Sequence, residues 1–481
     1  MSSGFSLELI TFFIYFVFLI LIAFFSTKRQ RTDTEFILGN RSLSFWLTAL
    51  SAHASDMSSW LFLGYPALIF AGGLFNCWAA IGLVVFMFLN WHFIAPKIRT
   101  VTEQSNSLTL SAYFESRFGD KSGKLRVVSA FMSVLFFTFY ISSGLVALGL
   151  LVESVFGLPY TVGISIGLAI VVIYVFAGGY KTIAYIDLFQ GFFLLGVIVF
   201  IPCLLLYKFG GISSIMTKVH AKGLSTSLFP SFQWKTFWDI FALSVPWGLP
   251  YFGQPHILTK FMGIRQVSEM KKAKYLGMSW QTIALSAATL LGLIGISLFP
   301  HGLHNPERLV LEIVQTRLPP LFAGLVLCAI LAATTNVMAA QILVVASNLS
   351  EDFYKRLFRP DATSSELLLV SRVSVLAIGI VAFFIAFFKI SSIYELVLYS
   401  WSGLGASFGP LVLVSLYTKK INRHGAFWGI LNGGLGTAIW YSVDQFYHLG
   451  IPSLFVGFTL SLLSIGIISY LTKENTESVP Q

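Results

Sequence analysis

Long apolar stretches dominate this sequence and constrain its fold more than any other feature. A membrane-spanning helix needs about 20 apolar residues, whereas a strand of a membrane barrel needs only about ten alternating ones. Only 11% of the residues are charged, against about a quarter in soluble domains. We therefore expect an all-α integral membrane protein in the lipid bilayer, with about 13 transmembrane helices. The stretches lie near 7–26, 43–71, 75–95, 127–155, 161–179, 185–207, 236–257, 275–299, 320–347, 370–389, 393–417, 425–443 and 453–472.

Basic residues are distributed unevenly over the connecting loops. If the N-terminus lies outside, all but seven of the 31 Lys and Arg residues fall on the inside; the exceptions are Lys208, Lys218, Lys222, Lys235, Arg308, Arg317 and Lys389. Cytoplasmic loops of membrane proteins carry this excess of positive charge. We therefore expect a multi-pass protein of the inner (cytoplasmic) membrane with its N-terminus outside and its C-terminus in the cytoplasm. The formal net charge of +10 then reflects topology and not nucleic-acid binding.

The second apolar stretch contains an acid, for which a lipid-facing helix has no use. Asp56 lies within the small and polar run from Ser51 to Trp60, with Gly64 and Pro66 just beyond. Charged residues inside a membrane face the protein interior or a water-filled cavity, and non-helical backbone is tolerated only there. The run predicts a broken helix that lines a binding site; the plainer alternative is a polar patch buried by neighbouring helices.

The seventh apolar stretch is broken as well. Pro246, Pro250 and Pro255 fall with two glycines within eleven residues, and each proline lacks an N–H and clashes with the preceding helical turn. Broken segments in corresponding positions of two halves point to the binding site of a transporter. The second and seventh stretches are five apart, so we expect two inverted five-helix repeats with broken first helices. The resulting single transmembrane domain, residues 1–481, would comprise an extra helix at 7–26, repeats at 43–207 and 236–417, and C-terminal helices at 425–472.

Aromatic residues accompany the second break. Trp247 and Tyr251 are four residues apart and share a face of any helical turn. With Tyr140 they would form a wall for a small apolar ring, although an ordinary packing stripe has the same pattern.

Several motifs resemble those of the sodium/solute symporter family, and most closely those of the bacterial sodium/proline symporters. The likeness extends with little gapping over nearly the whole chain. It implies about 13 helices around inverted repeats, alternating access and sodium-coupled uptake of L-proline, with no enzyme activity and no cofactor besides the coupling ion. The motifs are Leu50 to Gly64, YFGQPHILTKFM from Tyr251 to Met262, Gly178-Gly179 with Asp187 and Gln190, WSGLGASFGP from Trp401 to Pro410, Arg41 within Gly-Asn-Arg-Ser-Leu, and Glu351-Asp352.

The resemblance also implies where the ligands bind. Proline is expected near the two breaks, because a zwitterion needs hydrogen-bond donors where a half-helix opens and acceptors on unwound carbonyls. The substrate residues would be Ser58, Trp60, Gly64, Tyr140, Trp247, Tyr251, Gln254 and Pro255. For sodium, the resemblance implies the second-stretch residues Ala54, Asp56 and Met57 and the ninth-stretch residues Ala333, Thr334 and Asn336. Asp187 and Arg41 would contribute to a gate or to a second cation site.

Departures from the family pattern leave the coupling ion open. An ungapped alignment puts Asn336 and Val337 at the two hydroxyl positions of the family; an amide oxygen can bind a cation, but valine cannot. Thr334, one turn away, is a candidate replacement. His53 stands where the family favours a small residue, and it could carry a proton or be a neutral packing residue with a hydrogen bond, which we favour. Sodium coupling is thus the leading hypothesis, and proton-coupled or sodium-independent uptake is the alternative.

Other functions compete with sodium-coupled proline transport. The substrate could be another small amino acid, a betaine or a carboxylate. A membrane sensor is disfavoured because the tail after Tyr470 is short and polar. A membrane enzyme is disfavoured because the intramembrane acids are too few and scattered for a paired catalytic site.

Overall fold

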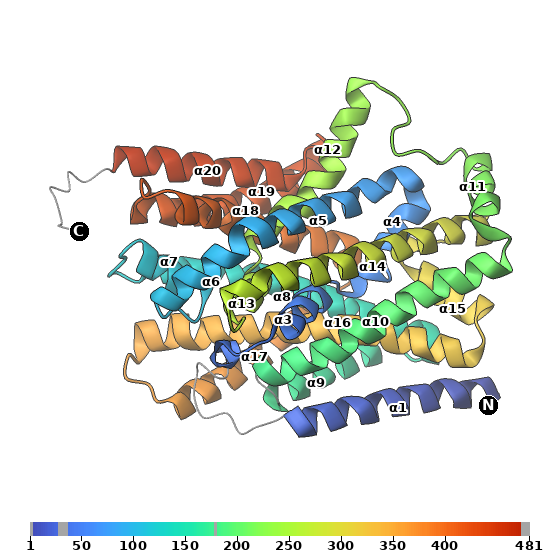
Figure 1. Cartoon of the computed structure of the whole chain (residues 1–481), viewed down its shortest axis with the longest axis horizontal. Helices are drawn as coiled ribbons and strands as arrows, with labels where there is room; N and C mark the ends of the chain where they lie inside the picture. Colours follow the sequence, from blue (N-terminus) through green and yellow to red (C-terminus); the bar gives the residue numbers. More distant parts are fainter. Residues whose placement is uncertain (1–2, 27–36, 178–179, 473–481) are drawn as a thin grey trace.

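The computed structural model describes residues 3–26, 37–177 and 180–472, and this part of the chain consists of helices joined by turns and loops, with two isolated β-bridges and no longer strands. Most of the long helices run roughly along one axis and pack side by side (Figure 1). The predicted all-α fold is confirmed within the described residues. The Gly178-Gly179 motif lies outside them.

The helices follow one another with short connections. The first half of the chain contains α1 (Ser3–Ser26), α3 (Phe45–Ala54), α4 (Gly64–Gly72), α5 (Trp78–Leu89), α6 (Ala95–Gln104), α7 (Leu110–Arg117), α8 (Lys124–Phe156), α9 (Tyr160–Ala177), α10 (Tyr180–Lys208) and α11 (Gly211–Ala221). The second half contains α12 (Trp234–Gly248), α13 (Pro255–Met262), α14 (Met270–Leu298), α15 (Leu309–Arg317), α16 (Pro320–Ser347), α17 (Ser364–Phe387), α18 (Ile393–Tyr417), α19 (Arg423–Tyr447) and α20 (Ser453–Leu471). Short turns of other helix types include η2 (Ser59–Leu61), η4 (Asn90–Ile94), η5 (Leu249–Gly253), η7 (Pro306–Arg308) and η8 (Asn348–Phe358).

Eight helical segments among the described residues are long and apolar enough to cross a membrane. Further apolar helices are shorter, partly because α3 and α4 are separated by a break. The chain is therefore a membrane protein with many spans. The eight segments are Leu74–Gln104, Lys124–Phe156, Ile183–Lys208, Val267–Leu298, Pro320–Phe358, Ser364–Phe387, Ile393–Tyr417 and Ser453–Leu471.

Burial separates a central group of helices from a peripheral one. The most apolar windows of α16, α8 and α18 are 83%, 78% and 78% buried inside the protein, whereas those of α17 and α20 are 28% and 33% buried. A helix that is apolar on all sides and buried belongs to the core. The exposed apolar faces of α17 and α20 are those expected of helices in contact with lipid. The centre of the molecule is thus formed by α8, α16 and α18, and the two breaks pack against it.

The two broken helices are joined where α3 begins and α13 ends. The amide of Leu43 donates to the carbonyl of Gly263 at 3.2 Å, and the amide of Arg265 donates to the carbonyl of Leu43 at 2.8 Å. Helix α18 also packs closely against the second break. A Cβ on Gly405 of α18 would lie 2.5 Å from the Cβ of Pro250 in the break. Only a small residue permits this approach, which explains a glycine of the WSGLGASFGP motif.

Candidate functional site

The first break lies between α3 and α4 and frees backbone carbonyls. In a continuous helix the amide of Ser58 would bond the carbonyl of Ala54, but it bonds that of Asp56 at 3.0 Å. The amide of Leu61 likewise bonds the carbonyl of Ser58 at 3.0 Å and not that of Met57. Ala54 and Met57 are both buried. Their carbonyl oxygens have lost their helical partners and are available to a ligand such as a cation.

The second break lies between α12 and α13 and is supported by neighbouring side chains. Gln254 has an extended backbone (φ −83°, ψ 105°) between η5 and α13. The carbonyl of Trp247 accepts a hydrogen bond from Trp401 Nε1 at 2.8 Å, and that of Tyr251 accepts one from Asn90 Nδ2 at 3.0 Å. Pro255 has no N–H for the carbonyl of Tyr251, so Asn90 supplies the missing donor, and Trp401 supplies one for the carbonyl of Trp247. The break is therefore a stable part of the fold.

The two breaks meet across a small cavity. Tyr251 donates its hydroxyl to Asp56 Oδ2 at 2.5 Å, and the rings of Trp60 and Trp247 lie 4.6 Å apart. The space left between these side chains is small. Its lining is largely aromatic and consists of Asp56, Met57, Ser58, Trp60, Leu83, Tyr140, Trp247, Tyr251, Val397 and Trp401.

Three of the residues expected at the substrate lie beside this cavity and not in its wall. A Cβ on Gly64 would lie 2.8 Å from Trp60 Cδ1, so the glycine makes room for the indole. Gln254 donates Nε2 to the carbonyl of Trp401 at 3.0 Å. Pro255 lines a different cavity. These residues shape the site without lining it, whereas the other five expected residues all line it.

Three lining residues were not singled out by the sequence: Leu83, Val397 and Trp401. Trp401 packs edge-on against Tyr251 at 5.1 Å and bonds both sides of the second break. Trp401 is the first residue of the WSGLGASFGP motif. The motif indicated the family but did not indicate that this tryptophan contacts the second break. Leu83 and Val397 carry no local signal, because apolar residues fill every helix of this chain.

The expected ion-binding residues of α16 are buried, and this helix contacts the first break. Ala333, Thr334 and Asn336 are at most 1% exposed, and α16 contacts both α3 and η2. Thr334 donates its hydroxyl to the carbonyl of Ile330 at 2.7 Å, which leaves its oxygen able to accept or to bind a cation. Neither polar atom of the Asn336 amide has a hydrogen-bond partner within the described part of the chain. An unpaired buried amide is costly, so Asn336 is suited to a ligand that its oxygen would bind.

His53 is packed away from the cavity. Its Nε2 accepts a hydrogen bond from Trp91 Nε1 at 3.1 Å, and because an indole can only donate, this nitrogen carries no proton. Gly277 of α14 leaves the space for the ring, since a Cβ there would lie 2.3 Å from it. The geometry agrees with a neutral packing histidine and shows the compensating glycine that accommodates it.

Asp187 and Arg41, the residues expected in a gate or a second cation site, both make contacts that fix the position of α13. Lys260 Nζ lies 2.9 Å from Asp187 Oδ2, and Ser51 also donates to this carboxylate. Arg41 donates to the carbonyl of Met262, the last residue of α13, at 3.0 Å, and to the carbonyl of Thr102 at 2.9 Å. Asp187 is thus paired with a cationic side chain of the protein itself. Both interactions fix the half-helix that follows the second break.

One end of the cavity is covered by aromatic and acidic side chains. Trp247 Nε1 donates to the hydroxyl of Tyr394 at 3.3 Å. The carboxylate of Glu307 accepts from the amides of Ile393 and Tyr394 at 3.1 and 2.8 Å, at the N-terminus of α18. An anion is favourable at that position because the helix dipole is positive there. Glu307 and Tyr394 also line a wide, open depression.

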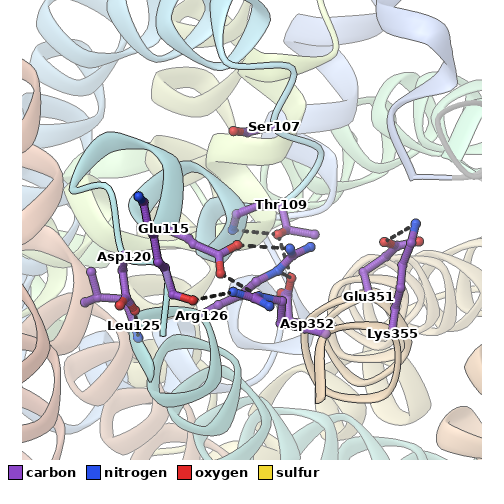
Figure 2. A network of polar contacts seen from close by, with 12 residues as sticks. Ser107, Thr109, Glu115, Asp120, Leu125, Arg126, Glu351, Asp352 and Lys355 are labelled. Carbon is purple, nitrogen blue, oxygen red and sulfur yellow. Dashed lines mark hydrogen bonds and ion pairs between the residues drawn. The ribbon is translucent and has the colours of Figure 1, made fainter. Parts of the chain in front are cut away.

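A separate network contains ion pairs between charged side chains (Figure 2). Arg126 binds Asp352 at 2.6 Å and Glu115 at 3.1 Å, and Arg356 binds Glu115 at 2.7 Å. Thr109 donates to Asp352 at 3.1 Å. The network ties α7, α8 and η8 together, and Glu351-Asp352, noted as a family motif, supplies its central acid.

Comparisons with known proteins agree with this geometry. The family model described as "Sodium:solute symporter family" matches residues 36–433. The high-affinity proline transporter PutP of Bacillus subtilis (strain 168) is 38% identical over 467 residues, covering 96% of this chain and 97% of that protein. A sodium/proline symporter of Staphylococcus aureus (strain JH9) is 36% identical, covering 96% and 92%. A solved Na+-coupled sialic acid symporter in a substrate-bound outward-open state has a TM-score of 0.79 at 20% identity, covering 97% of this chain and 98% of its own, which shows a shared fold.

Proposed function

Because the chain belongs to the sodium:solute symporter family, we propose that it carries L-proline into the cell together with sodium, by alternating access. It is a secondary active transporter and not an enzyme. The names of the proline-transporting relatives support the substrate. The observation that carries the proposal is the small aromatic cavity between two broken helices, with freed carbonyls and a buried acid beside it.

The cavity offers complementary groups for each part of proline. The aromatic rings of Trp60, Tyr140 and Trp247 face the pyrrolidine ring. Trp60 Nε1 is buried and has no hydrogen-bond partner among the described residues, so it is a donor for the carboxylate, together with the hydroxyl of Ser58. Carbonyls of the unwound backbone accept from the substrate ammonium. Gly64, Gln254 and Pro255 support this arrangement from behind the wall.

Sodium binds where the first break meets α16. The carbonyls of Ala54 and Met57 supply oxygens, Asp56 supplies a nearby negative charge, and Asn336 supplies its amide oxygen. Ala333, through its carbonyl, and Thr334, through its hydroxyl, complete the set of hard oxygen ligands. The unpaired amide of Asn336 supports this assignment, and the neutral state of His53 favours sodium over proton coupling.

The driving force is sufficient for concentrative uptake. One positive charge moving through 100 mV supplies about 2.3 kcal/mol, and a tenfold ion gradient adds about 1.4 kcal/mol. Together they support a proline gradient of roughly several hundred-fold with one ion per substrate.

The helices fit thirteen spans arranged as two inverted repeats. The first repeat consists of α3 with α4, then α5, α8, α9 and α10, and the second consists of α12 with α13, then α14, α16, α17 and α18. The remaining spans are α1, α19 and α20. In the cytoplasmic membrane the N-terminus lies outside, which puts the ion-pair network of α7, α8 and η8 inside, together with most of the Lys and Arg residues, as the charge distribution requires.

Uptake of radiolabelled proline into proteoliposomes tests the proposal. We expect accumulation with an inward sodium gradient at constant pH, competed by unlabelled proline but not by betaine or unrelated amino acids. Asn336→Ala should abolish sodium dependence, whereas Val337→Ser, which adds a hydroxyl, should lower the sodium concentration needed for half-maximal uptake. Uptake that ignores sodium and follows a proton gradient would contradict the assigned coupling ion, and strong competition by another solute would contradict the substrate.

A further inference from the structure

His256, the second residue of α13, is a buried polar group that the site above does not use. It is 1% exposed, and neither ring nitrogen has a hydrogen-bond partner within the described part of the chain. Its ring packs edge-on against Tyr140 at 6.3 Å and against Trp401 at 6.3 Å, the far side of the wall of the substrate cavity. Leaving a buried donor or acceptor unpaired costs about 1–3 kcal/mol, so such a group points to a ligand.

A second, narrow cavity lies on the side of His256 that faces the cytoplasmic network. Thr109 and Ser111 line it, and Thr109 also bonds Asp352 of that network. Pro255, His256 and Lys260 form the wall contributed by α13. The layer of Tyr140, His256 and Trp401 therefore separates two cavities that follow one another from the centre of the protein to its inner end.

The chemistry of this inner cavity suits a small zwitterion. Lys260 uses one of its three N–H groups on Asp187 at 2.9 Å, so two donors remain. The imidazole of His256 adds a third donor. Hydrogen bonds to an ionised carboxylate are about twice as strong as those between neutral groups, and Phe408 and Leu343 offer apolar surface for a ring.

We propose that the cavity lined by His256 and Lys260 is a second, inner binding site, which receives the carboxylate of the transported amino acid after it leaves the central cavity. This inference rests on the proposed function, since the ligand is the same substrate. The substrate then occupies two binding sites in succession on its way to the cytoplasm, and movement of Tyr140, His256 and Trp401 connects them. Once the carboxylate binds, the unpaired imidazole obtains its missing partner.

Protection of a thiol placed in the inner cavity tests this site. In a variant in which Cys77, Cys203 and Cys328 are replaced by serine or alanine, Ser133→Cys puts a reactive group in the cavity wall. We expect proline to slow its modification by a small methanethiosulfonate reagent. His256→Ala should raise the half-protecting proline concentration about tenfold, the effect of one hydrogen bond to a charged group. His256→Gln keeps an N–H donor and should raise it less.

Trp247→Ala distinguishes the two cavities, because it damages the central one alone. Protection at Ser133→Cys that persists in this variant, while high-affinity uptake is lost, supports a separate inner site. Protection that disappears together with uptake, or that is unchanged by both His256 substitutions, overturns it. Proline uptake by the parent protein without any protection refutes only the inner site, whereas absence of proline uptake by the parent refutes the proposed function.

Discussion

Replacing Tyr251 by phenylalanine removes one oxygen from the point where the two broken helices meet. This hydroxyl donates to Asp56 Oδ2 at 2.5 Å and accepts from Gln281 Nε2 at 2.9 Å. Tyr251 is 0% and Asp56 6% exposed, so water has little access to replace the lost group. A hydrogen bond to a charged group contributes about 1.5–3 kcal/mol. At 1.36 kcal/mol per decade, the loss corresponds to about a 10- to 100-fold change in affinity.

We expect this change in both ligands, because Asp56 lies next to the freed carbonyls and also lines the substrate cavity. In proteoliposomes, Tyr251→Phe should raise the sodium concentration for half-maximal uptake and the KM for proline, each at least about tenfold. Tyr65→Phe is the matched control, since its hydroxyl bonds Thr289 at 2.7 Å and does not line the cavity. If both parameters of Tyr251→Phe stayed within about twofold of the parent, as expected for the control, the hydroxyl would not support either site.

Two further substitutions test the packing and the polar turns. Gly277→Ala should lower the unfolding temperature, because its Cβ would lie 2.3 Å from the His53 ring and overpacking costs about 1–3 kcal/mol. The double variant His53→Ala/Gly277→Ala should recover most of this lost stability and still show sodium-driven uptake. A loss of sodium dependence in the double variant would instead indicate that His53 carries a proton. Burial alone would raise the pKa of Asp120, but hydrogen bonds from Ser122 and from the amide of Leu125 outweigh it and hold this pKa below its ordinary value. The ionised carboxylate therefore stabilises the start of α8 above the unfolded pKa of about 4, and the stabilisation is lost as the pH falls through the lower folded pKa. Thermal unfolding should accordingly show Asp120→Asn less stable than the parent by about 1 kcal/mol at pH 7 and nearly equal to it at strongly acidic pH; a difference independent of pH would contradict this role.

Part of the candidate site could be predicted because its signals are local. The polar run around Asp56 and the prolines from Pro246 to Pro255 mark interruptions that any helix would show. The spacing of Trp247 and Tyr251 also predicted an aromatic wall with Tyr140, and the resemblance to a known family added Ser58 and Trp60 as substrate residues. It did not separate the residues in the wall from those behind it, such as Gln254, since that depends on which way each side chain turns.

Other features depend on contacts between distant parts of the chain. Tyr251 reaches Asp56 across 195 residues of sequence, and Lys260 pairs with Asp187 across 73. His53 stands where the family favours a small residue, and the glycine that accommodates its ring, Gly277, lies on another helix. No periodicity or spacing encodes such pairs, because they result from how neighbouring helices pack.

The sequence by itself determined the class of protein, the approximate spans and the two breaks. These follow from the length of apolar stretches in a medium where every backbone group must be satisfied within the protein, and from the missing N–H of proline. Only the tertiary structure decided that the breaks face each other, that Trp401 completes the central cavity and that His256 lies between two cavities. Each of these requires side chains from several helices to converge, and convergence is a property of the packed molecule and not of any one segment.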